Sequence, residues 1–398
     1  MTSRDEVLEN HTVVVRDGRI LDLLPSHRAA DRYAATVHAD RSQHVLLPGL
    51  VNAYTQIAPA LGRSTRPERL HDGAQLCIAD MLRSGITCFC AAGYFPDESA
   101  RAALETGLRG LIGLPIGEAT SPWAASGEYL TRALEFRDEY RGHPSIATAF
   151  APVVPAAISD DTFTKIATVA NEVDTGLIVP LHASRTEVED SIARHGLRPL
   201  ERMLKLGLLT PALTAVHMAH IDAQDRELAQ RGGIALTLCP EADVRHGNAP
   251  PVNAWAGAGL RLGVGSGTAP HTGQNLWGDL KLLALLSLSS THEPPLLDAW
   301  DALSAATRGA AATLGLDQEI GTLERNKWAD ICCVDLQSPA MQWLCDAPAQ
   351  DLPRQLVFNG GRDTVSDVWV AGRQLLDGGT FTRLDWPTLK ARVDSRNA

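Results

Sequence analysis

The stretch Leu47-Pro48-Gly49-Leu50-Val51-Asn52-Ala53-Tyr54-Thr55-Gln56 marks the point at which the chain changes its organisation. Before it, the apolar run 44–47 predicts a strand that ends at Pro48 and Gly49, because both residues weaken a regular ladder. A second strand is expected near Val51. From there to about residue 315, predicted strands and helices alternate, so this decapeptide opens the main domain of the chain.

Seven further strands are expected after the one near Val51, and helix-like segments separate them. The strands are expected at 87–90, 109–114, 146–151, 177–182, 213–217, 234–238 and 261–265. The helical segments are expected at 72–84, 100–106, 126–140, 160–172, 184–195, 223–231 and 276–288. Eight strands that alternate with helices over about 250 residues predict an α/β fold, the (β/α)8 TIM barrel. Dinucleotide-binding folds alternate in the same way, but no G-x-G-x-x-G turn follows an early strand here.

Both ends of the chain are rich in predicted strands. Residues 12–15 and 19–24 flank an Asp-Gly turn and predict a β-hairpin. The tail contains strand-like runs at 328–334, 365–370 and 374–376. Two β-rich ends on either side of a barrel predict a small composite β-sandwich built from both termini. The expected parts are 1–48 for the N-terminal part of the sandwich, 49–319 for the barrel, and 320–398 for the C-terminal part with the tail.

The composition excludes several classes of function. The chain has 398 residues, of which 44% are hydrophobic and 21% charged, values typical of a globular protein with a large core. A formal charge of −11 and the lack of a basic stripe argue against a nucleic-acid partner. The best candidate for a membrane span, 280–288, is too short and contains Lys281, so no membrane partner is expected. The N-terminal residues lack the pattern of a signal peptide.

The cysteines point to a reducing compartment. Seven of them occur at irregular spacing, and we expect reduced, mostly buried thiols in a cytoplasmic protein. Cys88 and Cys90 alternate along a predicted strand, but no second pair follows at the spacing of a zinc finger. A cysteine-based zinc site is therefore not expected.

Short motifs carry a family resemblance along nearly the whole chain. They are Pro-Gly-Leu-Val-Asn-Ala at 48–53, Asp-Met-Leu-Arg-Ser-Gly-Ile-Thr-Cys-Phe at 80–89, and the segments 193–196, 199–200, 216–218, 239–241, 320–324 and 327–330. Together they resemble the TRZ/ATZ branch of the amidohydrolase superfamily, and most closely the methylthioadenosine/S-adenosylhomocysteine deaminases. The resemblance implies the barrel fold, a dimer, and hydrolysis of a C–N bond by a zinc-bound water.

The resemblance also implies which positions hold zinc. Two histidines follow the first barrel strand, one lies on the fifth and one on the sixth, and an aspartate lies on the eighth, while a glutamate after the fifth moves protons. Of these groups, His217 on the sixth strand is kept. Because phenol and amide groups are poor zinc ligands, we expect a degenerate site with no metal and no cofactor. The degenerate positions are Tyr54, Gln56, Pro180, Ala183 and Gly267.

Several polar side chains are expected at the carboxyl ends of the barrel strands, where barrel sites lie. One interpretation is a zinc site rebuilt around His182, His217 and His220; another is that these histidines are hydrogen-bonded remnants. An acid–base pair of His217 with Glu241 or Asp243 is a third, and a Cys239 nucleophile is a fourth. The pocket candidates are His217, His182, His220, Glu241, Asp243, Tyr54 and Gln56. Of these, His220, Glu241 and Asp243 are expected on loops that follow the strands, as are His246 and His271.

Three functions remain open on this basis. The favoured hypothesis is a non-catalytic pseudoenzyme that binds a small molecule or a partner subunit. The first alternative is a deaminase-like hydrolase that acts on a C–N bond of a nucleoside or heterocycle, with a rebuilt or metal-independent site. The second is a structural subunit of a hetero-oligomer with an active paralogue. For partners, the resemblance implies a homodimer or a heterodimer with a paralogue.

Overall fold

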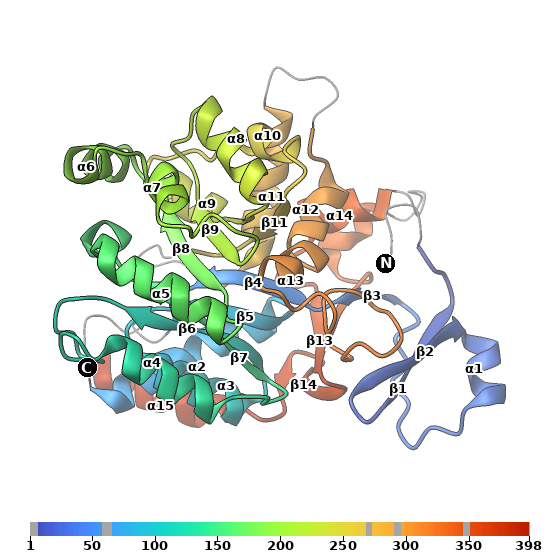
Figure 1. Cartoon of the computed structure of the whole chain (residues 1–398). Coiled ribbons are helices and arrows are strands. Elements are labelled where there is room, and N and C mark those ends of the chain that lie inside the picture. Colours follow the sequence, from blue (N-terminus) through green and yellow to red (C-terminus); the bar gives the residue numbers. More distant parts are fainter. Residues whose placement is uncertain (1–6, 58–65, 268–272, 290–295, 345–350, 398) are drawn as a thin grey trace.

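The computed structural model describes residues 7–57, 66–267, 273–289, 296–344 and 351–397. Eight parallel strands follow one another around a nearly closed barrel, each paired with the next in chain order (Figure 1). This confirms the predicted barrel. Its strands are β4 (Leu50–Thr55), β5 (Ile86–Ala92), β6 (Arg109–Ile116), β7 (Ile146–Pro152), β8 (Leu177–Leu181), β9 (Leu213–His217), β10 (Ala235–Leu238) and β11 (Arg261–Val264).

The barrel closes where its first and last strands meet. Thr55 bridges Gly267 in the parallel sense, and the Gly267 amide donates to the Tyr54 carbonyl at 3.0 Å. A Cβ atom at Gly265 would lie 2.6 Å from the Tyr54 backbone nitrogen, so glycine is what allows the two strands to approach. Tyr54 is thereby held at the seam of the barrel.

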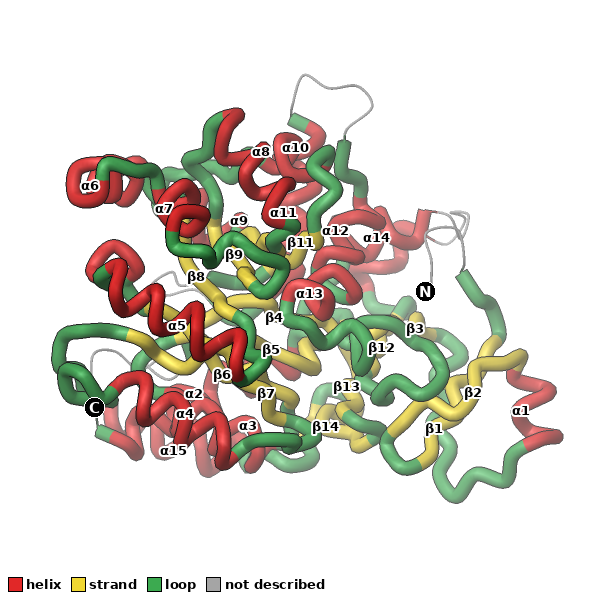
Figure 2. Tube along the Cα trace, in the orientation of Figure 1, coloured by secondary structure: helices red, strands yellow, loops and turns green. Residues whose placement is uncertain are grey.

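Helices cover the outside of the barrel, as Figure 2 shows. Apolar side chains from the strands and from the inner faces of these helices form one large buried cluster. The helices are α2 (Pro67–Arg83), α3 (Pro96–Thr106), α4 (Tyr129–Glu139), α5 (Asp160–Glu172), α6 (Arg185–His195), α7 (Pro199–Lys205), α8 (Ala223–Gly232), α9 (Pro240–Arg245), α10 (Val252–Ala256), α11 (Leu276–Leu288), α12 (Ala299–Ala305) and α13 (Arg308–Thr313).

A separate antiparallel domain is built from both ends of the chain, which confirms the predicted composite domain. Its larger sheet has the order β15-β14-β13-β12-β3, so the N-terminal β3 lies at the edge against β12. The hairpin of β1 and β2 forms a second sheet. The strands are β1 (His11–Arg16), β2 (Arg19–Pro25), β3 (His44–Pro48), β12 (Ile331–Asp335), β13 (Val365–Val370), β14 (Arg373–Asp377) and β15 (Thr380–Phe381).

Three helices outside the barrel ring were not expected from the sequence. They are α1 (Ser26–Arg32), α14 (Leu352–Asn359) and α15 (Trp386–Asn397). The last one returns to the barrel, where Arg392 Nε donates to Asp72 Oδ1 of α2 at 3.0 Å. Of the helices in the described part of the chain, none is long and apolar enough to cross a membrane.

A buried ion pair joins the amino end of the barrel to the small domain. Arg109, the first residue of β6, donates to both carboxylate oxygens of Asp330, at 2.9 and 3.2 Å. The Ala371 amide donates to the same carboxylate, and the third guanidinium nitrogen donates to the Pro144 carbonyl. Both partners are nearly fully buried and fully bonded, so the pair fixes the two domains against each other.

Candidate active site at the carboxyl end of the barrel

The site is built around His217, the last residue of β9. Its backbone has a φ of 74°, a left-handed conformation that is rare for a residue other than glycine. The ring lies close to Asp243, and Nδ1 is 2.7 Å from Asp243 Oδ1. Because the carboxylate can only accept, Nδ1 carries the proton and the lone pair of Nε2 remains available.

Asp243 reaches His217 because α9 starts immediately after β10. Pro240 stands at the first position of this helix, where its missing N–H costs nothing. The sequence interpretation had placed Glu241 and Asp243 on a loop, and α9 corrects that. The second carboxylate oxygen of Asp243 is buried and has no hydrogen-bond partner among the described residues.

Tyr54 forms one wall around His217. The two rings meet edge to face, with their centroids 5.8 Å apart. Tyr54 is buried, and this burial raises the pKa of its phenol, so the hydroxyl stays protonated at neutral pH. Tyr54 is thus a neutral group that can donate a hydrogen bond beside His217.

Glu187 lies in the first turn of α6, just after the neighbouring strand β8, and was missed by the sequence interpretation. Its carboxylate accepts the backbone N–H groups of His182, at 3.1 Å, and of Ala183, at 2.6 Å. Burial raises the pKa of Glu187, and the hydrogen bonds from the Ala183 and His182 amides act in the opposite direction. A signal was present, because Ser184 precedes Glu187 by three residues in the pattern of a helix start, and Ser184 Oγ accepts from the Glu187 amide.

His182 is used by the fold. The ring is fully buried, and its Nδ1 lies 3.1 Å from the His220 carbonyl while its Nε2 accepts the Leu200 amide at 3.2 Å. Burial lowers the pKa of His182, which keeps the ring neutral. With both nitrogens engaged, His182 cannot serve as a metal ligand without losing one of these bonds.

The other polar candidates point away from a shared centre with His217. The Nε2 atom of His220 lies 2.7 Å from Asn248 Oδ1, and His246 Nδ1 lies 2.8 Å from the Ala242 carbonyl. Glu241 pairs with Arg245 on the same helix at 2.6 Å. His271 lies outside the described residues.

Two further buried groups stand behind α9. Asp279 of α11 accepts the Glu241 amide at 2.9 Å, and burial raises its pKa far above that of an ordinary carboxyl group. Burial likewise raises the pKa of the Cys239 thiol, so Cys239 is protonated and inert as a nucleophile at neutral pH. Asp279 and Cys239 are therefore buried groups on this side of α9, and burial raises the pKa of both.

The side chains at the positions that the resemblance assigns to zinc ligands do not suit zinc. Tyr54 and Gln56 offer a phenol and an amide, while Pro180 and Gly267 offer no ligand atom in their side chains. At Gly267 a Cβ atom would lie 2.6 Å from the Ala242 Cβ, so an aspartate there would need the backbone to move. The described residues at this mouth do not form the set of three or four ligands that zinc takes.

A different cluster in the small domain can reach one metal ion. Ligand atoms of His44, Cys333 and Asp367 all lie within 4.8 Å of one another. This group is at the start of β3 and in β12 and β13, away from the barrel mouth.

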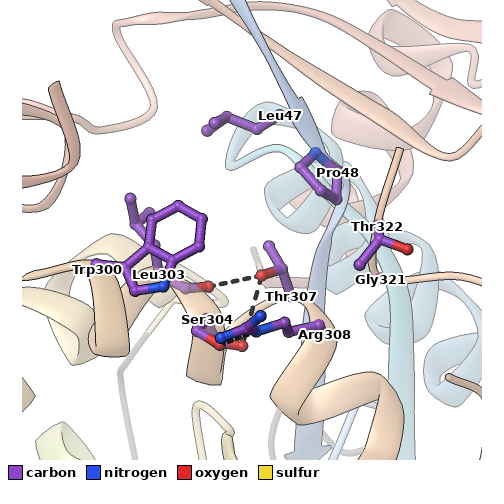
Figure 3. Close-up of a pocket in the computed structure, with 9 residues that line it drawn as sticks. All are labelled: Leu47, Pro48, Trp300, Leu303, Ser304, Thr307, Arg308, Gly321 and Thr322. Atoms are coloured by element: carbon purple, nitrogen blue, oxygen red, sulfur yellow. Dashed lines mark hydrogen bonds between the residues drawn. The ribbon is translucent and has the colours of Figure 1, made fainter. Parts of the chain in front are cut away.

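Figure 3 shows a cavity near the amino end of the barrel, between β3, α12 and α13. Its volume of about 20 Å³ is enough for one water molecule and too small for a nucleoside. The indole N–H of Trp300 is buried there and has no partner among the described residues, so we expect it to bind an ordered water. The cavity is lined by Leu47, Pro48, Trp300, Leu303, Ser304, Thr307, Arg308, Gly321 and Thr322.

Comparisons with known proteins agree over nearly the whole chain. A model of the Amidohydrolase family matches residues 45–375. The 5-methylthioadenosine/S-adenosylhomocysteine deaminase of Saccharophagus degradans is 31% identical over 95% of this chain and 89% of its own length. A zinc-bound adenosine deaminase from Xanthomonas campestris superposes with a TM-score of 0.93 at 32% identity, covering 98% of this chain and 93% of that one. Zinc-bound atrazine chlorohydrolase TrzN from Arthrobacter aurescens has a TM-score of 0.87 at 21% identity over 98% and 95%, which is a likeness of fold.

These findings correct two expectations. The pseudoenzyme hypothesis, and with it the purely structural subunit, is wrong, because similar proteins are named deaminases and similar structures are zinc-bound hydrolases. The expectation of no cofactor is wrong as well, because those structures bind zinc and the described residues include His44, Cys333 and Asp367 as a candidate metal group. Both errors have one cause: five substituted positions at the mouth were taken to decide the chemistry of the whole protein.

Proposed function

Because the chain belongs to the amidohydrolase family, we propose that it is a hydrolase of non-peptide C–N bonds. Its substrate is an amino-substituted heterocycle, in the first place an aminopurine nucleoside. The deaminase names of proteins that match the full length of the barrel support this substrate class. The reaction takes place at the carboxyl end of the barrel, where His217 and Asp243 meet.

The hydrogen bond between His217 and Asp243 carries this proposal. It fixes the ring so that Nε2, rather than Nδ1, is free to take a proton. In the same mouth, both ring nitrogens of His182 are engaged by backbone groups. His217 therefore combines a ring oriented by a carboxylate with a second nitrogen that has no hydrogen-bond partner among the described residues, an arrangement that suits a proton acceptor.

The chemistry follows from the groups around this nitrogen. Water gives a proton to His217 Nε2 while its oxygen bonds to the amino-bearing ring carbon. The amino nitrogen then takes this proton from Nε2 and leaves as ammonia, and the added hydroxyl passes its proton to the adjacent ring nitrogen as the ring carbon becomes a carbonyl carbon. Asp243 stabilises the imidazolium formed in the first step, and the neutral phenol of Tyr54 donates a hydrogen bond beside it.

Ammonia release tests the proposal. The full-length protein is incubated with 5′-methylthioadenosine, S-adenosylhomocysteine and adenosine, and ammonia and the purine absorbance are followed together. We expect turnover of at least one of them, and a fall of about 100-fold or more in His217→Ala. His246→Ala is the matched control, because His246 caps the same helix through Ala242 without contacting His217 in the described structure.

Two outcomes of this assay would contradict the proposed function. Equal turnover in His217→Ala and the unchanged protein would place the reaction elsewhere. Absence of ammonia from all three nucleosides and from an aminotriazine would remove the proposed substrate class.

Three broader properties remain proposals with their own measurements. The zinc of similar structures supports a metal cofactor here, which elemental analysis per mole of chain checks. The family resemblance supports a dimer, which light scattering checks. Six free, buried cysteines among the described residues support the cytoplasm as the location, which cell fractionation checks.

A further inference from the structure

We propose that His44, Cys333 and Asp367 bind one zinc ion as a structural site of the small domain. The three residues lie on adjacent strands of the five-stranded sheet, in the order β3, β12, β13. Cys333 is directly opposite Asp367 in the antiparallel pairing, and His44 pairs with Asp335, two residues along the strand from Cys333. The register of the sheet therefore holds the three side chains together before any ion arrives.

The donor set suits zinc. Zinc takes imidazole nitrogen, thiolate sulfur and carboxylate oxygen at about 2.0–2.3 Å, so ligand atoms within 4.8 Å of one another reach one ion after small rotations. Sulfur with nitrogen also disfavours magnesium and calcium, which prefer oxygen. Three protein ligands leave a fourth position for water.

The His44 side chain gives independent evidence that a ligand is missing from this group. Its Nδ1 atom is buried and has no hydrogen-bond partner among the described residues. Buried polar atoms are nearly always bonded, so an orphan nitrogen on a histidine that lies within reach of a thiol and a carboxylate indicates a missing ligand. The side chain of His44 is 20% exposed, and this gives an ion a path from solvent.

Arg41 lowers the affinity of the site for a metal ion. Its guanidinium donates to both oxygens of Asp367, at 2.8 and 2.7 Å, so the metal must share this carboxylate with a positive charge. Binding also removes the thiol proton of Cys333, which leaves to solvent as the zinc–sulfur bond forms. Because this proton is lost on binding, we expect the affinity to increase with pH.

Cobalt is the sharpest probe, because a thiolate bound to Co2+ gives a charge-transfer band in the near ultraviolet. The full-length protein is stripped with a chelator, dialysed, and titrated with CoCl2 and then ZnCl2. We expect one Co2+ per chain with this band, displacement by zinc, and a rise in melting temperature with either metal. His44→Gln and Cys333→Ser should each weaken binding more than about tenfold, and Cys333→Ser should abolish the band.

Two controls separate this site from the barrel mouth. Cys332→Ser changes the neighbouring cysteine, which packs toward Gly85, and should keep the band. His217→Ala should keep it as well while losing turnover. Arg41→Gln should tighten binding, because it removes the competing charge from Asp367. Absence of the band in the unchanged protein, its loss in His217→Ala, or its full retention in Cys333→Ser would overturn the proposal.

Discussion

The barrel carries a hydrogen-bonded charged pair at each end, and the two pairs differ in what they leave open. At the amino end, Arg109 and Asp330 use every charged nitrogen and oxygen on each other or on nearby backbone groups. At the carboxyl end, neither His217 Nε2 nor the second oxygen of Asp243 has a hydrogen-bond partner among the described residues. Both pairs are mostly buried, so burial does not separate them.

The two pairs differ in whether all of their hydrogen-bonding nitrogen and oxygen atoms already have partners. A pair whose hydrogen bonds are all satisfied holds elements together, and changing it changes stability. A pair with an open nitrogen can exchange protons with a bound substrate. This agrees with the usual division of TIM barrels, in which the carboxyl face carries chemistry and the amino face carries stability.

The largest effect is expected from Asp330→Ala. This change leaves the Arg109 guanidinium buried without its carboxylate, and we expect a loss of about 3–5 kcal/mol in the free energy of unfolding. Urea unfolding monitored by tryptophan fluorescence measures it. A loss below about 1 kcal/mol would show that the amino-end pair does not bind the two domains together.

Asp243→Asn is the counterpart at the carboxyl end. The amide no longer holds the imidazolium, so we expect turnover to fall about 100-fold, which corresponds to about 2.7 kcal/mol in the barrier. The free energy of unfolding should change by less than about 1 kcal/mol. If unfolding changes strongly while turnover does not, the assignment of the two ends is reversed.

His182 predicts how stability depends on pH at the mouth. Its pKa is lowered by burial, so the unfolded chain binds a proton near pH 6.5 while the folded chain does not. The stabilisation is fully present above that pH and is lost as the pH falls toward the folded pKa, with a slope of at most about 1.4 kcal/mol per unit. His182→Gln should flatten this part of the curve in urea unfolding.

The smallest effect is expected in the cavity of Figure 3. Trp300→Phe removes the buried indole N–H that has no protein partner, together with the water that we expect there. Loss of packing area and loss of an unsatisfied donor oppose each other, so the free energy of unfolding should change by less than about 1 kcal/mol. Trp255→Phe is the comparison variant, because it removes an N–H that is bonded to the Met218 carbonyl. Thermal unfolding of both variants measures the difference.

The barrel could be predicted because the patterns that specify each strand and helix lie within short segments of the sequence. Alternating apolar runs and helical segments predicted the strands from β4 to β11 in order, and an Asp-Gly turn predicted the first hairpin. Helix α15 was missed, because its docking on α2 depends on contacts such as Arg392 with Asp72 that are 320 residues apart. The domain boundaries at 48 and 319 remain predictions, although β3 ends at Pro48 and β4 begins at Leu50.

The site could be predicted only in part. His217 and Asp243 were named as one possible pair, but the same argument offered Glu241, which turned out to pair with Arg245. Glu187 reaches the mouth through the turn that starts α6, and no spacing rule gives that direction. The metal group in the small domain joins residues from opposite ends of the chain, so only the pairing of β3 with β12 and β13 brings it together.

The same composite domain has a consequence during protein synthesis. Strand β3 is complete early, but its partner β12 begins at Ile331, after the entire barrel has been translated. At about 5–20 residues per second, the ribosome needs on the order of half a minute to make that interval. Throughout this time the edge of β3 lacks its partner strand. Unpaired strand edges promote aggregation, so the nascent chain is more exposed to aggregation than the finished molecule and depends more on chaperones.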